Sequence, residues 1–129
     1  MNVGIIINNS SCKVVDCKIF HHNVGGVLAT VSPGDKISFV KTNFTENTGT
    51  GIFSKGQGDI VVEYGRLEKN HGSGIKIIDC SNLSILSNEI TENLLHGCEI
   101  INCDGLVMMN NLYKNKGNGL LLETCNGGR

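Results

Sequence analysis

Cysteines are the residues of this chain best suited to chemistry, because a thiolate can act as a nucleophile, bind a metal or form a disulfide. Three of the six, Cys80, Cys103 and Cys125, follow one another at spacings of 23 and 22 residues. Cys12 and Cys17 have four residues between them, whereas zinc sites typically have two. We therefore expect no metal and no cofactor, and we interpret Cys80, Cys103 and Cys125 as a structural column of stacked thiols.

The histidines form no catalytic set with other residues. His21 and His22 are adjacent, and His71 and His96 stand apart from them in the sequence. No Ser, His and Asp or Cys and His arrangement converges, so nucleophilic catalysis has no support. The chain also has no Trp and only two Tyr to stack on sugars. We predict no catalytic residue in this chain.

Composition and charge exclude several classes of partner. The chain has 129 residues, 40% of them hydrophobic, which fits one domain with a modest core. Eleven Lys and Arg against twelve Asp and Glu give a net charge of −1, so we expect no nucleic-acid partner. Apolar runs are too short to span a membrane, and residues 1–9 lack a signal-peptide pattern. We therefore expect reduced thiols and an intracellular location, cytoplasmic or nuclear.

The elements that position these residues are indicated by an internal repeat. Its marker residues are Asn23, Asn47, Asn70, Asn93 and Asn115. Successive markers are 24, 23, 23 and 22 residues apart, and each is followed within a few residues by a Gly and an apolar run. Asn tolerates the left-handed turn conformation, and amides stacked on adjacent repeats can hydrogen-bond each other. We predict that these residues form a structural asparagine ladder.

Each repeat contains three short apolar segments. The first follows the Gly, as in Ile75–Ile77, and the second comes about nine residues later, as in Leu83–Ile85 and Leu106–Met108. The third is a single apolar residue three positions before each Asn, beginning with Phe20. Alternation with period two indicates strands, and strands this short bury their faces only by stacking. The prediction is an all-β, right-handed parallel β-helix of about five to six coils of 22–24 residues, with three strands per coil.

The predicted coils have consequences for the surface and the ends of the domain. One position before each Asn lies a column of alternating charge: His22, Glu46, Lys69, Glu92 and Lys114. We expect ion pairs between neighbouring coils there.

A leucine-rich repeat, the competing solenoid, would need a longer Leu-rich phrase and a helix. We interpret residues 1–129 as a single β-helix domain from a longer protein, with its open ends covered by flanking coils or another chain.

The outer face of the first strand is the candidate binding surface. Counting two residues after each Gly gives the outward column Ile6, Leu28, Phe53, Lys76, Glu99 and Leu121, of which the first five are the candidate contacts. Its first three members form an exposed apolar stripe. We expect this stripe to be covered by a segment of the same protein, or by a partner protein or peptide. Lys76 and Glu99 are expected to pair across coils.

The phrase at residues 88–97, Asn-Glu-Ile-Thr-Glu-Asn-Leu-Leu-His-Gly, resembles the right-handed β-helix repeats of carbohydrate-binding proteins and sugar hydrolases. The resemblance covers nearly the whole chain. Such repeats occur in pectate-lyase-like enzymes and also in non-catalytic proteins such as F-box substrate receptors of ubiquitin ligases. The resemblance implies the fold and leaves the activity open.

An enzyme of this shape, a polysaccharide lyase or glycoside hydrolase, would need clustered carboxylates and a base. The best acidic group, Asp79, Glu99, Asp104 and Glu123, is spread over three coils. Arg66 has Asn43 and Glu89 as column neighbours, which suggests an ion pair and not a base.

Three functions remain from the sequence. The favoured one is a non-catalytic scaffold that binds a protein partner, similar to the substrate-recognition region of a ubiquitin-ligase receptor. The first alternative is a β-helix that binds or cleaves an acidic polysaccharide, with Lys55, Lys76 and Lys116 as anion contacts. The second alternative is a purely structural repeat protein.

Overall fold

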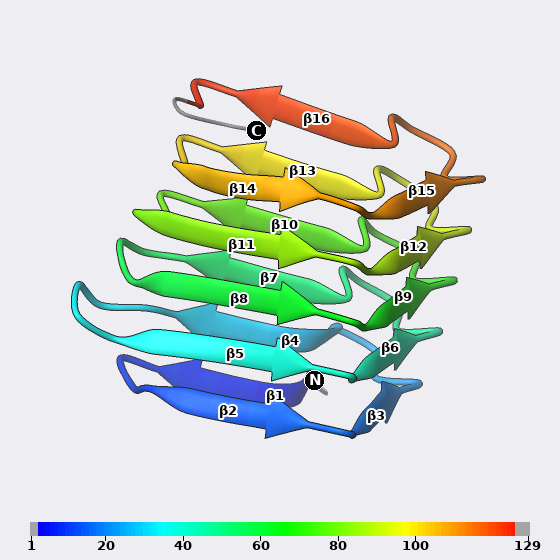
Figure 1. Ribbon diagram of the computed structural model, residues 1–129. Helices are drawn as coiled ribbons and strands as arrows, with labels where there is room; N and C mark the ends of the chain where they lie inside the picture. Colours follow the sequence, from blue (N-terminus) through cyan, green and yellow to red (C-terminus); the bar gives the residue numbers. More distant parts are fainter. Residues whose placement is uncertain (1–2, 126–129) are drawn as a thin grey trace.

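The computed structural model describes residues 3–125, which form sixteen short strands in three parallel sheets (Figure 1). Sheet A contains β1 (Val3–Asn8), β4 (Gly25–Thr30), β7 (Ile52–Lys55), β10 (Ile75–Ile78), β13 (Cys98–Ile101) and β16 (Leu120–Glu123). Sheet B contains β2 (Cys12–Val15), β5 (Lys36–Val40), β8 (Asp59–Glu63), β11 (Asn82–Leu86) and β14 (Gly105–Met108). Sheet C contains β3 (Lys18–Phe20), β6 (Asn43–Thr45), β9 (Arg66–Glu68), β12 (Glu89–Thr91) and β15 (Asn111–Tyr113). The predicted all-β solenoid is confirmed, with about five turns and no helix within the described residues.

Each strand pairs with its equivalent one coil along the chain, so equivalent residues stack. Ile52 of β7, for example, pairs with Val27 of β4 on one side and Ile75 of β10 on the other. All three side chains point inward and are at most 1% exposed. Because side chains alternate across a strand, the residues between them point outward in columns of their own.

The turns before β7, β10, β13 and β16 are held by a ladder of asparagines. Asn47, Asn70 and Asn93 are fully buried, and each Nδ2 donates to the Oδ1 of the next ladder residue at 2.9–3.0 Å. The last acceptor is Asn115. Each Nδ2 also donates to a strand carbonyl, as Asn70 does to Phe44 at 3.1 Å. These buried amides are therefore satisfied by their neighbours.

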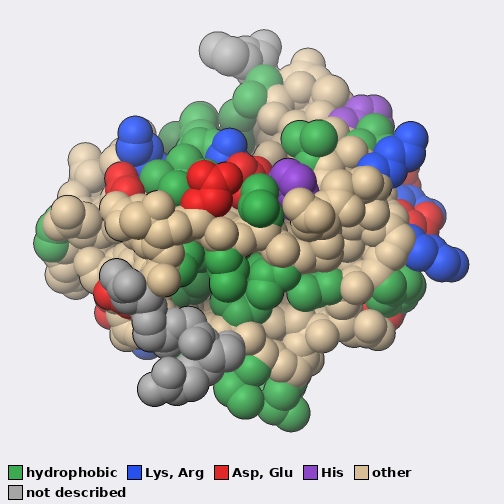
Figure 2. Space-filling view, turned by 90° about the horizontal axis from the view of Figure 1, so that it is seen from above, with side chains coloured by type: hydrophobic (Ala, Val, Ile, Leu, Met, Phe, Trp, Pro, Cys, Tyr) green, Lys and Arg blue, Asp and Glu red, His purple; other side chains and the backbone are tan. Residues whose placement is uncertain are grey.

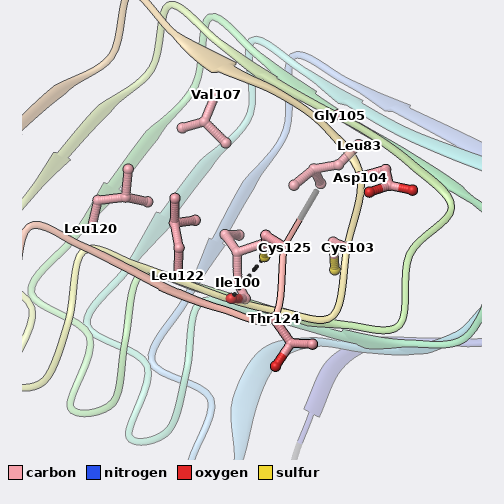
Figure 3. Close-up of a pocket in the computed structure, with 10 residues that line it drawn as sticks. All are labelled: Leu83, Ile100, Cys103, Asp104, Gly105, Val107, Leu120, Leu122, Thr124 and Cys125. Atoms are coloured by element: carbon pink, nitrogen blue, oxygen red, sulfur yellow. Dashed lines mark hydrogen bonds between the residues drawn. The ribbon is translucent and has the colours of Figure 1, made fainter. Parts of the chain in front are cut away.

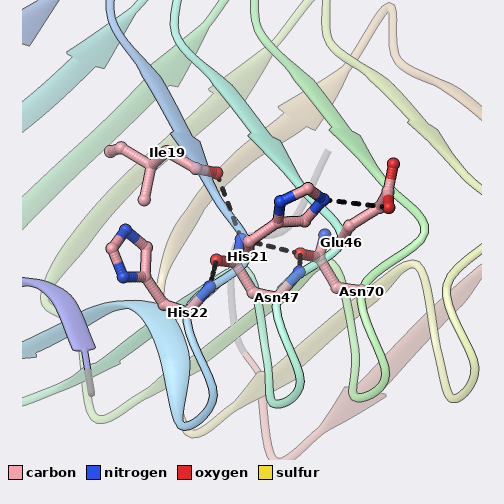
Figure 4. A network of polar contacts seen from close by, with 6 residues as sticks. All are labelled: Ile19, His21, His22, Glu46, Asn47 and Asn70. Atoms are coloured by element: carbon pink, nitrogen blue, oxygen red, sulfur yellow. Dashed lines mark hydrogen bonds and ion pairs between the residues drawn. The ribbon is translucent and has the colours of Figure 1, made fainter.

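Asn23 was placed in this ladder by its spacing, and the structure corrects that assignment. His22, not Asn23, donates its backbone N–H to Asn47 Oδ1 at 3.1 Å (Figure 4). Asn23 is exposed. The reason is the distance to the first inward residue of the following strand. That distance is five residues from His22 to Val27 and from Asn47 to Ile52, and it would be four from Asn23.

The same offset corrects the third strand of the first coil. Ile19, not Phe20, pairs with Phe44, and Ile19 is 6% exposed whereas Phe20 is 49% exposed. The charge column therefore begins at His21, whose Nε2 lies 3.1 Å from Glu46 Oε2 (Figure 4). Within residues 3–125 the members after Glu46, which are Lys69, Glu92 and Lys114, form no ion pair, so the continuous ladder of charges predicted from the sequence does not exist.

A second register correction concerns β14. Gly105 pairs with Leu83 and occupies its inward position, whereas Leu106 was expected there and instead points outward, 39% exposed. Val107 then pairs with Ile85. Gly105 has φ +147°, and a Cβ there would lie 2.1 Å from the Leu83 carbonyl oxygen. The close approach of the two coils at this point accounts for a glycine that the apolar pattern could not reveal.

Candidate protein-binding face

The predicted binding column lies on the outer face of sheet A. Its members are Ile6, Leu28, Phe53, Lys76 and Glu99, one on each of β1, β4, β7, β10 and β13, and consecutive members are paired in register. The strands position them because the residues on either side point into the core. The structure thus brings the five residues into a single row along the solenoid.

The N-terminal half of this row is apolar and open to solvent. Ile6 is 60% exposed, Leu28 is 43% exposed and Phe53 is half-buried. Side chains of this type normally lose water contact on folding, so the row leaves unburied apolar area on a rigid sheet.

A groove of about 280 Å³ runs beside the apolar row. It is lined by Val3, Val24, Gly25, Val27, Leu28, Gly49, Thr50 and Phe53. Val24, in the turn before β4, is 39% exposed and was missed from the sequence, because turn residues follow no strand alternation. Its apolar type in an otherwise polar turn is the signal that could have revealed it.

The row becomes charged at Lys76. Its Nζ lies 5.8 Å from the centroid of the Phe53 ring and 3.7 Å from Glu99 Oε2, so the expected ion pair between Lys76 and Glu99 is formed. Lys55, two residues after Phe53 on the same face, is exposed. Lys116 lies in the turn before β16, which is two strands beyond β10 in sheet A. The three lysines considered for an anion site are therefore not gathered in one place.

The cysteine column is a set of neighbouring free thiols. All six cysteines of the chain are free. The Cys80 N–H donates to Cys103 Sγ at 3.3 Å, and the Cys125 thiol donates to the Glu123 carbonyl at 3.3 Å. Burial raises the pKa of Cys80 to about 11 and also raises that of Cys103. Raised pKa values disfavour the reactive thiolate, which fits a packing role.

A cavity beside these thiols opens at the C-terminal end of the coils. It has a volume of about 600 Å³, and hydrophobic side chains are visible across this end of the molecule (Figure 2). Figure 3 shows its lining: Leu83, Ile100, Cys103, Asp104, Gly105, Val107, Leu120, Leu122, Thr124 and Cys125. Most of these are core positions of the last coils, so the cavity is continuous with the core.

Comparison with known proteins agrees with this geometry. A family model described as the right-handed beta helix region matches residues 1–128. The chain belongs to the right-handed β-helix family. Comparison with curated proteins and with solved structures gives no match. The residues described include no helix long and apolar enough to cross a membrane.

In this right-handed β-helix, the residues considered for catalysis neutralise one another. Arg66 Nη2 lies 2.6 Å from Glu89 Oε2, and Arg66 Nη1 lies 3.7 Å from Glu68 Oε1. The Tyr113 hydroxyl donates to Glu89 Oε1 at 2.8 Å, and this hydrogen bond raises the pKa of Tyr113. Asn43, the other column neighbour of Arg66, lies on β6. The outer face of sheet C thus carries a closed polar network with Arg66 fully paired.

The acidic residues of the β-helix do not converge either. Asp79 accepts from Asn102 Nδ2 at 2.9 Å, Glu99 pairs with Lys76, and Asp104 lines the C-terminal cavity. Within residues 3–125, no group of three or more His, Cys, Asp and Glu side chains is placed to hold a metal ion.

Proposed function

We propose that this β-helix is a non-catalytic scaffold that binds a protein partner on the outer face of sheet A. The observation that carries the proposal is the exposed apolar row of Ile6, Leu28 and Phe53, in register on three adjacent strands. Solvent-exposed apolar side chains gathered in one place are typical of protein interaction sites.

The backbone beneath the row favours binding without reorganisation. The three side chains project from paired strands over a buried core, so a partner would not have to order a loop. The groove beside Val24 adds apolar surface that a partner can cover. The proposed role is similar to that of the substrate-recognition region of a ubiquitin-ligase receptor. Its six free thiols are consistent with a cytoplasmic or nuclear location.

The proposal is tested by photo-crosslinking in a eukaryotic cell extract. A photoreactive phenylalanine analogue is placed at Leu28, and in a matched control at Ser84, which points outward from sheet B. We expect discrete protein adducts at position 28 that are absent at position 84. The adduct protein, once purified, should bind the wild-type chain and not a folded variant in which Ile6, Leu28 and Phe53 are all changed to Glu.

Equal labelling at both positions, or equal binding by wild type and the triple variant, would refute the proposed face. Adducts that consist of glycan and not protein would favour the alternative of polysaccharide binding. Absence of adducts at either position would favour a purely structural role.

A further inference from the structure

We propose that the docking element of the partner is an amphipathic α-helix that lies along the solenoid axis on Ile6, Leu28 and Phe53. The helix carries a carboxylate that faces Lys55. This inference rests on the proposed function and specifies the chemistry of the partner that the same face accepts.

The spacing of the row selects a helix over an extended peptide. The row presents one apolar side chain per coil, and neighbouring coils are roughly 4.8 Å apart. A helix running along the axis presents an apolar residue about every 5.4 Å. Over the two steps from Ile6 to Phe53, the spacing of the helix residues therefore departs from that of the row by about 1 Å in total. Side chains on one face of an extended peptide repeat about every 6.7 Å, which gives a mismatch of about 4 Å over the same two steps.

The surroundings of the row have the shape that a helix requires. On the side of the turns, Val24 and Thr50 line the groove of about 280 Å³ and give the helix an apolar flank. On the opposite side, β4 and β7 end at Thr30 and Lys55, which are both exposed and are paired with each other in register. The helix therefore lies between an apolar wall and a polar, cationic edge.

Lys55, the cation at that edge, forms no ion pair within residues 3–125. The four strands β1, β4, β7 and β10 contain no Asp or Glu. Lys76, by contrast, is occupied by Glu99 and the Phe53 ring. A carboxylate within one turn of the helix residue that contacts Phe53 complements Lys55.

The inference is tested with a phage-displayed library of random 16-residue peptides. The library is panned on the immobilised 129-residue chain after depletion on the folded Phe53→Glu chain. We expect enriched sequences to have apolar residues at three- and four-residue spacing with an Asp or Glu in the adjacent turn. A synthetic peptide of the enriched sequence should become helical on binding, seen by circular dichroism.

Titration of the same peptide by fluorescence anisotropy tests the charge. Lys55→Glu should weaken binding at least about fivefold, because it replaces an attraction by a repulsion. Lys55→Arg should preserve the affinity. Lys13→Glu, a matched exposed lysine on sheet B, should leave it unchanged.

Each other outcome overturns the inference. Enriched peptides with alternating apolar residues, or peptides that bind Lys55→Glu as well as wild type, would refute the acidic helix while leaving the apolar face as a binding site. A library that yields no peptide dependent on Phe53 would also refute it. Self-association that buries the row, detected by sedimentation, would mean that a second copy and not a partner helix occupies the face. The photo-crosslinking experiment judges the proposed function separately from these results.

Discussion

Asn70 Nδ2 donates a hydrogen bond of 3.0 Å to Asn93 Oδ1, and the Asn70 N–H donates to the same oxygen at 3.1 Å. One side chain thus accepts both groups of the residue in the preceding coil. This arrangement explains why Asn recurs at a regular spacing in the sequence, because each coil must supply an amide for its neighbour.

Replacing Asn70 by Ala should destabilise the chain by about 2–5 kcal/mol. The change leaves the buried N–H of Asn47 without its acceptor, removes one of the two acceptors of Asn47 Nδ2, and removes the hydrogen bond from Asn70 to the Phe44 carbonyl. Asn23→Ala should change stability by less than about 0.5 kcal/mol, because Asn23 is exposed and outside the ladder. Urea unfolding followed by circular dichroism measures both. Equal costs at the two positions would contradict the exclusion of Asn23 from the ladder.

Ile75→Asp and Phe53→Glu should have opposite effects on the fold. Ile75 is fully buried between Ile52 and Cys98, so a carboxylate there is desolvated and the coils should separate. Phe53 points outward, so Phe53→Glu should retain the β-sheet spectrum and cooperative unfolding. A folded Ile75→Asp protein, or an unfolded Phe53→Glu protein, would show that the inward and outward assignments of sheet A are reversed.

Gly105→Ala should cost more stability than Gly34→Ala, although both glycines have positive φ. A Cβ at Gly105 meets the backbone of Leu83, which has to move, whereas a Cβ at Gly34 meets nothing within 4 Å. Gly34→Ala should cost only the backbone strain of roughly 1–2 kcal/mol. Thermal unfolding of the two variants provides the comparison, and a smaller loss for Gly105→Ala would argue against the position of β14.

Stability should fall as the pH rises above about 9. Burial raises the pKa of Cys98 from 9.0 to about 12 and that of Cys80 from 9.0 to about 11, so the folded chain binds protons that the unfolded chain releases. The stabilisation is complete below the unfolded pKa and is lost progressively as the pH approaches the folded values. Urea unfolding between about pH 7 and pH 11 measures this decline.

Cys98→Ala provides the control for that pH dependence. The variant should be less stable at neutral pH because it leaves a cavity in the core, and its stability should decline less steeply above about pH 9. An unchanged slope would mean that other groups, such as Tyr113, account for the loss.

The candidate face was accessible from the sequence only in part. The row of Ile6, Leu28, Phe53, Lys76 and Glu99 followed from counting two residues after each Gly, since alternation fixes which side chains point outward. The groove at Val24 did not follow, because a turn has no period from which direction can be counted. Lys55 was named as an anion contact, but the absence of an ion pair to it depends on which strands are neighbours.

The sequence by itself determined the fold and the length of the coil. Asn47, Asn70, Asn93 and Asn115 repeat because each stacks on the next, and Gly residues follow them at a fixed distance because the ladder leaves no room for a Cβ. At Gly51, for instance, a Cβ would lie 3.1 Å from Asn70 Nδ2 and 2.5 Å from the Gly74 carbonyl.

Only the tertiary structure decided the register where the repeat is imperfect. In the first coil the local sequence fits Asn23 as well as His22, and the choice is made by pairing Ile19 with Phe44. At β14 the apolar pattern favours Leu106, and the close approach of Leu83 requires Gly105 instead. Both registers depend on contacts between residues more than twenty positions apart. Such contacts cannot be predicted from the pattern of neighbouring residues in the sequence.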